Sequence, residues 1–426
     1  MPNANAYDAP PVTPGYRLLG YPTDLAGYLG ALGPLPLPPG PDRRWAESLH
    51  GALESSGLTG RGGAAFPTSV KLGVARAGRS RGVLVVNGME GEPASDKDKL
   101  LLLTMPHLVL DGAQLLGAAC GAERVLVCVP VGRDGVAGAV QAAITERRAQ
   151  SYARIHEGIV RPPSRFVAGE ESALAQWIDS GLSRPSFRPD KSVALRIGKK
   201  PALVHNAETL AHVGLIARRG PDAFRSRGLA EEPGTTLVTI SGAVAQPGVV
   251  EVDRGTSLQA IVGRANPTEP LAALLVGGYG GAWVGPEHFD MPYASFWLRT
   301  IGVSAGVGVV VALGAAGCGL AETARLAHYL AGQSSGQCGP CVHGLPAIAE
   351  DLTLLAYGRG DPGLMARLLR RVEQVDGRGG CRHPDGAVGM VRSALGVFAA
   401  DVATHQQGVP CAYWSAASQF RAPREG

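Results

Sequence analysis

The chain has 426 residues, of which 45% are apolar and 18% are charged, and its net charge is +4. This length exceeds what one small hydrophobic core organises, so two or three domains are expected. The nearly balanced charge gives no electrostatic basis for binding nucleic acid, and no such partner is expected. Seven scattered cysteines lack the density of a secreted disulfide scaffold, and no secretory signal opens the chain, so the cytosol is the expected compartment.

The first part of the chain is dominated by proline. Residues 1–42 end in the run Gly-Pro-Leu-Pro-Leu-Pro-Pro-Gly-Pro, which disfavours a regular helix or a central strand, and we predict a proline-rich arm. An amphipathic helix is predicted from Asp42 to Ser55. It leads into residues 56–68, where four glycines fall within seven residues. Such a loop exposes backbone N–H groups to a phosphate or a flat ring, although an ordinary surface loop of a glycine-rich protein has the same composition.

Apolar runs of strand length then alternate with helical segments, which predicts βαβ units and a largely parallel sheet. The first strand opens into a polar loop that contains Glu90 and Glu92, at the edge where open α/β sheets bind ligands. These carboxylates could accept hydrogen bonds from ribose hydroxyls, and a solvated turn is the simpler alternative. The predicted strands are residues 82–87 and 124–129, and the predicted helices are residues 105–120 and 136–150.

Two further segments predict helix starts. Residues 166–174 open a helix after a tight turn at Gly169, where the helix dipole favours the carboxylates of Glu170 and Glu171. Asn206 is predicted to cap a helix that contains Thr209, and a helix start of this kind also binds phosphate.

Short β runs replace this pattern from about residue 235. Runs at residues 237–241 and 249–252, followed by a capped short helix at residues 255–262, predict a small β-grasp-like module. Residues 301–321 carry no charge and are long enough to raise the question of a membrane span. Six glycines interrupt the stretch and residues 309–311 are β-branched, which favours a buried strand with turns, so no direct membrane span is expected.

The cysteines of the C-terminal part lie between segments of helix length. Cys338 and Cys341 stand three apart with Gly and Pro between them, so a tight turn can aim two thiolates at one iron or zinc centre. Cys381 is the next cysteine downstream, and Ser335 stands where a further thiolate is expected. A helical bundle that carries a metal cluster is predicted. Its helices are expected at residues 322–332, 345–357, 362–375 and 387–404.

Taken in order, these motifs resemble the flavoprotein subunit family of respiratory complex I and its relatives in NAD-linked hydrogenases and formate dehydrogenases. The resemblance runs from about residue 55 to about residue 405, and residues 60–68 are its most specific signature. It implies an α/β Rossmann-like domain, then a small β-grasp (soluble-ligand-binding) module, then a C-terminal helical bundle that carries an iron–sulfur site. The implied divisions are the arm at 1–42, an FMN/NADH-binding α/β domain at 43–230, a β-grasp domain at 231–300, a connecting strand with turns at 301–320 and an iron–sulfur helical bundle at 321–426.

The resemblance also implies cofactors and residue roles. The family binds FMN, NADH and one iron–sulfur cluster, with Phe66 stacking on the adenine and Lys71 lying near the nucleotide. Glu90, Glu92 and Glu171 would act catalytically beside the flavin and nicotinamide. The implied cofactor-binding residues are Gly60, Arg61, Gly62, Gly63, Ala64, Phe66, Lys71, Asn87, Gly169, Glu170, Asn206 and Thr209, and the implied cluster ligands are Cys338, Cys341, Cys381 and Ser335.

The implied activity is that of an NADH dehydrogenase-type electron-transfer subunit. Hydride passes from NADH to FMN, and single electrons then pass to the cluster and on to a ferredoxin-like or other iron–sulfur partner. The expected location is cytoplasmic, either free or peripheral to a membrane complex. The alternative is a non-catalytic iron–sulfur electron-transfer or scaffold protein that has lost productive FMN and NADH binding. A ligand-binding protein built on the β-grasp module is a third interpretation.

Some positions depart from the family pattern. Met89 stands where the family usually has Asp, Phe166 where it has Tyr and His205 where it has Asn. Each change alters a polar contact worth on the order of 1 kcal/mol. With Ser335 in the first ligand position, three thiolates and a hydroxyl could hold an oxygen-ligated [4Fe–4S] cluster, a three-iron cluster or no stable cluster.

Two other side chains are close enough in sequence to replace the missing thiolate. These are Cys318 and His343. The remaining cysteines, Cys120, Cys128 and Cys411, are expected to be structural.

Overall fold

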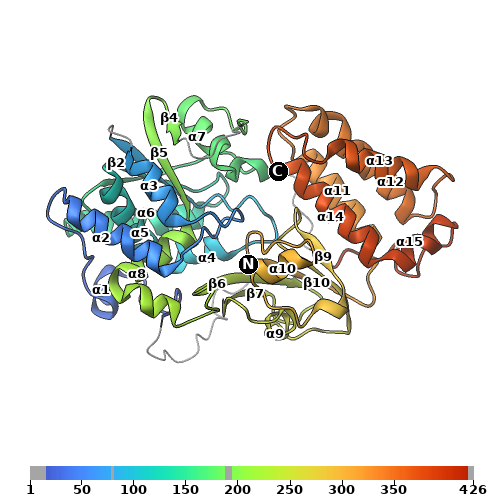
Figure 1. Cartoon of the computed structure of the whole chain (residues 1–426), viewed down its shortest axis with the longest axis horizontal. Helices are drawn as coiled ribbons and strands as arrows, with labels where there is room; N and C mark the ends of the chain where they lie inside the picture. The colour runs from blue at the N-terminus through green and yellow to red at the C-terminus, as the bar shows by residue number, and fades with distance from the viewer. Residues whose placement is uncertain (1–15, 78–80, 188–193, 421–426) are drawn as a thin grey trace.

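The computed structural model describes residues 16–77, 81–187 and 194–420. Two five-stranded sheets and a group of C-terminal helices make up this part of the chain. In Figure 1 the first sheet lies at the left, the second at the lower centre, and α11 to α15 lie at the right.

The first sheet has the strand order β3-β2-β1-β5-β4. Its first four strands are parallel, and β4 is an antiparallel edge strand. The parallel sheet predicted from the alternating pattern is therefore confirmed, and β1 has the bounds that were predicted. The strands are β1 (Gly82–Asn87), β2 (Ala122–Cys128), β3 (His156–Val160), β4 (Leu195–Ile197) and β5 (Lys200–Asn206).

Alternation along these strands places apolar side chains on both faces of the sheet. Leu84 and Val86 belong to the large core beneath the helices α2, α3, α5 and α8, whereas Val83 and Val85 pack toward α7. The helices of this region are α2 (Arg43–Ser56), α3 (Thr68–Ala77), α4 (Lys97–Thr104), α5 (Pro106–Cys120), α6 (Asp134–Ala149), α7 (Glu171–Ser180) and α8 (Ala207–Arg225), with a short 3-10 turn, η1 (Phe166–Gly169), before α7.

The predicted proline-rich arm is more ordered than its composition suggested. Within residues 16–42 a short helix, α1 (Leu25–Leu32), forms, and Asp24 caps it by accepting a hydrogen bond from the amide of Gly27. Tyr16 and Tyr28 are buried in the main core. The proline run at residues 33–41 forms neither a helix nor a strand, as predicted, and α1 lies before it. The first part of the predicted arm lies outside the described residues.

The second sheet has the order β7-β6-β10-β8-β9. Its central strand, β10, pairs parallel with β6 and antiparallel with β8. This strand comes from the uncharged stretch at residues 301–321, so the predicted buried strand is confirmed. The elements are β6 (Thr235–Gly242), β7 (Gly248–Asp253), β8 (Leu271–Val276), β9 (Ala282–Val284) and β10 (Val309–Gly314), with α9 (Leu258–Gly263), η2 (Pro286–His288) and α10 (Ser295–Thr300).

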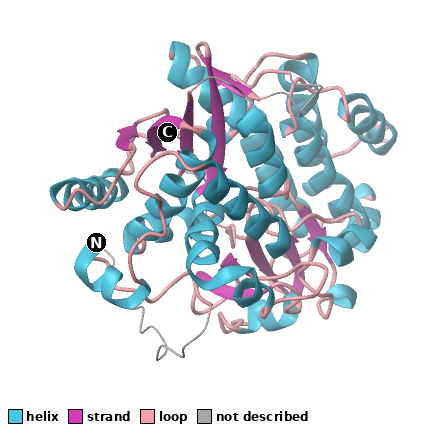
Figure 2. Ribbon diagram, turned by 60° about the vertical axis from the view of Figure 1, so that its left-hand side comes forward, coloured by secondary structure: helices cyan, strands magenta, loops and turns pink. Residues whose placement is uncertain are grey.

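Helices make up most of the described residues between β10 and Gln406, and Figure 2 shows helices beside the strands of both sheets. Trp283 of β9 joins the second sheet to these helices, with its ring centroid 5.0 Å from Phe398 and 5.6 Å from Phe420. The single helix predicted at residues 387–404 is two helices bent by 84° at Phe398. The helices are α11 (Gly319–Gly332), α12 (Leu345–Ala356), α13 (Leu364–Val375), α14 (His383–Val397) and α15 (Ala399–Gln406), with a π-helical turn, η3 (Pro340–Gly344).

Among the described residues, no single helix has both the length and the apolar composition needed to cross a membrane. Two bent helix pairs, α4 with α5 and α14 with α15, meet those criteria only when each pair is taken together.

Candidate flavin and iron–sulfur sites

The predicted ligand edge lies where the two halves of the first sheet diverge. The chain leaves β1 toward β2 on one side, and β5 joins β1 on the other, so the switch point of the sheet lies between β1 and β5. Asn87 and Asn206 face each other in register at the carboxyl ends of these two strands. Asn87 donates from Nδ2 to the carbonyl of Gly169 at 2.8 Å, which brings the turn before α7 to the same edge.

The glycine-rich loop, residues 59–67, closes over the start of α8. Its ends are pinned by a bridge between Thr59 and Pro67, and the amide of Arg61 donates to Oγ1 of Thr209 at 2.9 Å. The next four amides, from Gly62 to Ala65, form no hydrogen bond of standard geometry to another described residue. A row of backbone donors without protein acceptors is the arrangement that binds a phosphate.

The Arg61 side chain contacts the second sheet. Its guanidinium is buried and donates to the carbonyl of Thr235 at the start of β6 and to Oγ1 of Thr59. Burial, and then the nearby charge of Arg254, lower the pKa of Arg61 to about 10. Arg61 therefore anchors the loop to the second sheet.

A buried charge network supports the edge from below. Lys97 of α4 is 1% exposed and its Nζ lies 3.0 Å from Asp98 Oδ1, 2.8 Å from Glu208 Oε2 and 3.2 Å from Asn206 Oδ1. Asn206 also caps α8, as predicted, by accepting a hydrogen bond from the amide of Glu208. Burial opposes the charged forms, but the neighbouring carboxylates outweigh it and raise the pKa of Lys97, and Lys97 in turn lowers the pKa of Glu208.

The two carboxylates predicted after β1 are engaged within the protein. Glu90, at a positive φ of 42°, accepts hydrogen bonds from Ser95 Oγ and from the amides of Asp98 and Lys99, so it caps α4. Glu92 is 7% exposed and accepts from the amides of Ala94 and Tyr279. Burial raises the pKa of Glu92 to about 7.

Glu92 thereby ties the ligand edge to the second sheet. Its Oε2 comes so close to the turn after β8 that a Cβ at Gly278 would lie 2.5 Å away, and Gly278 has a positive φ of 97°. Glycine is required here for both reasons.

Lys71 and Glu171 form an ion pair that spans the edge. Lys71 of α3 also donates to the carbonyl of Val204 at 2.6 Å, and both side chains are partly exposed. Beside them, His205 is 4% exposed and its Nε2 has no hydrogen-bond partner among the described residues. Burial and then the charge of Lys71 hold the pKa of His205 well below its ordinary value, so this imidazole is neutral.

The remaining predicted residues of the edge differ in their surroundings. Glu170 accepts hydrogen bonds from the amides of Ser172 and Ala173 and caps α7. Phe66 is 38% exposed and open to a partner ring. Met89 is 3% exposed and packs with Ala168 and the apolar side chains beneath α7.

The predicted cysteines come together beside this edge. The Cys338 thiol receives hydrogen bonds from the amides of Gly380 and Cys341, and although burial opposes them, they lower its pKa. Burial, and then the neighbouring Cys338 thiol, raise the pKa of Cys341 to about 12, and Cys381 also interacts with it. Burial raises the pKa of Cys381, and the charge of Glu170 adds to this effect.

Phe166 joins the ligand edge, called the flavin edge below, to the segments that carry the cysteines. Its ring packs 5.3 Å from His383, two residues after Cys381, and 6.2 Å from Tyr329 of α11. Its amide donates to Oε1 of Gln333 at 3.1 Å, two residues before Ser335. The turn that starts α7 and the segments that carry the cysteines are therefore in direct contact.

Comparison with known proteins places both regions in one family. Residues 53–215 match the Nuo51 FMN-binding domain, and residues 321–405 match the iron–sulfur binding region of NADH-ubiquinone oxidoreductase-F. The chain belongs to this flavoprotein subunit family. The family resemblance inferred from the motifs is thus confirmed, as are the FMN-binding and iron–sulfur domains that it implied.

Full-length relatives of the family support the assignment. The chain is 28% identical to an F-type subunit of the NADH-quinone oxidoreductase of Rhizobium meliloti over 377 residues, which cover 85% of this chain and 89% of the relative. It is 27% identical to the corresponding NADH-quinone oxidoreductase protein of Streptomyces coelicolor over 395 residues, covering 89% of this chain and 87% of the relative.

Solved structures of the family have the same fold. An NAD⁺-reducing [NiFe]-hydrogenase in the H₂-reduced state superposes with a TM-score of 0.79 at 29% identity over 84% of this chain, and its air-oxidised state with 0.80 over 89%. The chain spans 63% and 66% of the length of those two hydrogenase chains.

The residues at the edge fit the flavin that this family binds. The unpaired amides of Gly62 to Ala65 suit a phosphate, and the unsatisfied Nε2 of buried His205 requires a polar partner. Lys71 supplies a cation at the same edge. The other predicted residues have structural partners: Asn87, Asn206 and Thr209 join strands and loop, and Glu90 and Glu92 hold the surrounding backbone.

The cysteines fit an iron–sulfur cluster with an incomplete thiolate set. Cys338, Cys341 and Cys381 are neighbours, and Ser335 is half-buried with its Oγ accepting from Gln337 at 3.0 Å. The proposed substitutes do not fill the gap in this structure. His343 is exposed, and Cys318 lies at the start of α11 beside Cys411.

Several residues that build the site escaped sequence reasoning. Lys97, Asp98 and Glu208 are polar and looked like solvated positions, yet all three are buried. The ion pair between Lys97 and Glu208 joins residues 111 positions apart in the sequence, and a single sequence gives no indication of such a pair. Gln333 had no signal of any kind.

Proposed function

We propose that this chain is the NADH-oxidising flavoprotein subunit of a larger electron-transfer complex. When bound, FMN accepts a hydride from NADH and releases the electrons one at a time to an iron–sulfur cluster. The observation that carries the proposal is the contact of Phe166 with Gln333 and His383, because it sets the flavin edge directly against the cysteine segments. Electrons can then cross between the two sites without leaving the protein.

Each side chain at the edge has a defined part in this proposal. The amides of Gly62 to Ala65 and the ammonium of Lys71 neutralise phosphate charge, and Phe66 offers an exposed ring to the adenine. Glu171 is the carboxylate available to NADH because its side chain is partly exposed, whereas Glu90 and Glu92 are held by backbone amides. Glu90 and Glu92 act as positioning residues and not as direct catalysts.

The cluster site requires Cys338, Cys341 and Cys381 as thiolate ligands and Ser335 as an oxygen ligand. An alkoxide in place of a thiolate lowers the cluster potential or yields a three-iron cluster. We further propose the division of the chain as an FMN/NADH domain at 43–230, a β-grasp domain at 231–300 that is completed by the strand of the connecting segment at 301–320, and an iron–sulfur helical bundle at 321–426. A ferredoxin-like or other iron–sulfur subunit takes the electrons, with this chain peripheral to the complex.

FMN titration of the purified protein tests the proposal. We expect one FMN per chain, an absorbance that bleaches on anaerobic addition of NADH, and a Lys71→Met variant that binds FMN about tenfold more weakly through the loss of one charge-assisted hydrogen bond. Lys200→Met is the matched control, because Lys200 begins β5 at the opposite edge of the sheet and pairs with Glu123. A folded wild type that takes up no FMN, or FMN that NADH leaves oxidised, would contradict the proposal and favour the scaffold alternative.

A further inference from the structure

A second group of soft metal ligands lies in the C-terminal helices, apart from the predicted cluster. Cys318 precedes α11, His405 lies near the end of α15, and Cys411 follows α15 in the loop. Their ligand atoms all lie within 4.8 Å of one another. The set contains no carboxylate, so two thiols and one imidazole converge from three segments.

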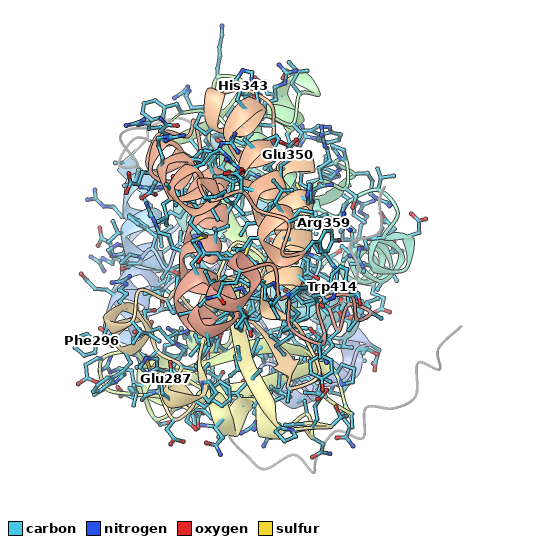
Figure 3. The ribbon with its side chains drawn as sticks, turned by 90° about the vertical axis from the view of Figure 1, so that its right-hand side faces the viewer. Glu287, Phe296, His343, Glu350, Arg359 and Trp414 are labelled. Carbon is cyan, nitrogen blue, oxygen red and sulfur yellow. The ribbon has the colours of Figure 1, made fainter. Side chains whose placement is uncertain are left out.

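The group is separate from the cysteines beside the flavin edge. Figure 3 places His343, two residues after Cys341, at one end of the helical region and Trp414, three residues after Cys411, well away from it. Cys338, Cys341 and Cys381 are not members of the converging set. The second group therefore cannot be a displaced ligand of the cluster.

Backbone amides hold two of the three ligand side chains in place. The Sγ of Cys318 accepts from the amide of Ala321 at 3.4 Å, so the thiol caps the N-terminus of α11. The amide of Cys411 donates to Nε2 of His405 at 2.8 Å. His405 is 0% exposed, and because its Nε2 accepts from that amide, the ring proton lies on Nδ1, which has no hydrogen-bond partner among the described residues. Zinc would bind Nδ1 with this proton moved to Nε2 and the Cys411 amide turned away.

We propose that Cys318, His405 and Cys411 bind one zinc ion. Zinc prefers thiolate and imidazole ligands, and in a tetrahedral site with its usual bond lengths the donor atoms lie roughly 3.4–3.8 Å apart. The distances between the three ligand atoms, all within 4.8 Å, would have to shorten by at most about 1 Å to reach these values. Both thiols release a proton to solvent on binding, so the divalent ion and two thiolates form a site without net charge that suits its buried surroundings.

The fourth position is open to water, since Cys411 is only half-buried. The ion would join the start of α11 to the loop after α15. Because α11 leads directly to the Gln333–Cys341 segment, the zinc would set the position of one end of the helix that carries the cluster loop. A disulfide between Cys318 and Cys411 is the competing use of the two thiols, but it leaves Nδ1 of the buried His405 without a partner among the described residues.

Metal analysis of the full-length protein, purified anaerobically and dialysed against a weak chelator, tests the site. We expect about one zinc per chain, lost in Cys318→Ser, Cys411→Ser and His405→Ala, while iron content stays at the wild-type level. Cys120→Ser is the matched control, because Cys120 ends α5 far from the group, and it should keep its zinc.

X-ray absorption at the zinc edge of the wild type covers the case in which a variant fails to fold. Two sulfur ligands at about 2.3 Å and at least one nitrogen ligand support the site. Wild-type protein that holds no zinc and binds none when it is added, zinc that is retained in the cysteine variants, or peptides of the isolated protein joined by a Cys318–Cys411 disulfide would each overturn the proposal. None of these results depends on flavin binding, so failure here is distinguishable from failure of the proposed function.

Discussion

Replacing Lys97 by methionine should cost this protein more stability than any other single charge removal near the flavin edge. Lys97 is 1% exposed and is the cation that Asp98 and Glu208 share, at 3.0 and 2.8 Å. Methionine fills a similar volume but leaves two carboxylates, 3% and 0% exposed, without their main partner. Breaking a buried pair in this way costs about 3–5 kcal/mol, which lowers the melting temperature by roughly 10 °C for a domain of this size.

The stability lost in Lys97→Met should depend on pH. Burial would raise the pKa of Glu208, but Lys97 and then Arg61 lower it, so its contribution to stability is present above its ordinary pKa and lost as the pH falls. The pKa of Lys97 is raised, so its own contribution is fully present throughout the neutral range. In Lys97→Met the pKa of Glu208 rises, and the deficit should be largest near pH 7.5 and shrink toward pH 5, where the carboxylates take up protons.

Thermal unfolding of wild type and variant at both pH values measures this deficit. Lys99→Met is the matched control, because Lys99 is two residues from Lys97 and forms an ion pair with Asp96 in which both side chains are partly exposed. We expect the control to change stability by less than about 1 kcal/mol. The buried network would be refuted as the support of the edge if Lys97→Met had the same melting temperature as the control at pH 7.5. It would also be refuted if Lys97→Met lost the same stability relative to wild type at both pH values.

Three further predictions concern the two sites and their junction. Ser335→Cys should complete the thiolate set and convert a three-iron signal in low-temperature EPR of the oxidised protein to a four-iron signal in the reduced protein, whereas absence of iron from both would end the cluster assignment. Burial raises the pKa of Glu92 to about 7, so its ionisation destabilises the fold as the pH rises. Urea unfolding should show that wild type loses about 2.5 kcal/mol of stability relative to Glu92→Gln between pH 5 and pH 8, and an equal change in both proteins would contradict this. Phe166→Ala should destabilise the protein by about 2 kcal/mol and slow the reduction of the cluster by NADH, measured by stopped-flow absorbance. Phe166→Tyr should match wild type. Equal reduction rates in the two variants would contradict a role for the Phe166 ring in joining the two sites.

Local chemistry explains which elements could be predicted. The bounds of β1 follow from an apolar run that ends at Asn87. Asn206 could be predicted as a helix cap because an asparagine oxygen can accept a hydrogen bond from a backbone amide of the first turn. The helix α4 was missed because its first turn, Lys97-Asp98-Lys99, has the composition of a solvated loop. It is a helix because Glu90 caps it and Lys97 finds its partners in α8.

Tertiary contacts explain what the sequence left open at the site. The order of motifs placed the glycine-rich loop, Asn87, the Glu171 turn and Asn206 at one edge, and the structure brings them together there. That Glu90 and Glu92 are already bound by backbone amides depends on the second sheet and on α4, which no local pattern reveals. The break at Phe398 comes two residues after Gly396, and the packing of the Phe398 ring on Trp283 is a contact between distant segments that no local pattern reveals.

The departures from the family pattern are of different kinds, and this decides how they bear on cofactor binding. Met89 is an apolar anchor packed beneath α7, so the aspartate it replaces is exchanged for core packing. Phe166 lacks a hydroxyl but keeps a ring between the two sites, where its packing on His383 is what matters. The other two departures change polar chemistry: His205 is a buried neutral imidazole with an unsatisfied Nε2, and Ser335 carries a hydroxyl that accepts a hydrogen bond from Gln337. If the two cofactors bind as proposed, the polar departures would tune the two redox centres, while the contact of Phe166 with His383 and Gln333 that joins the two regions is kept.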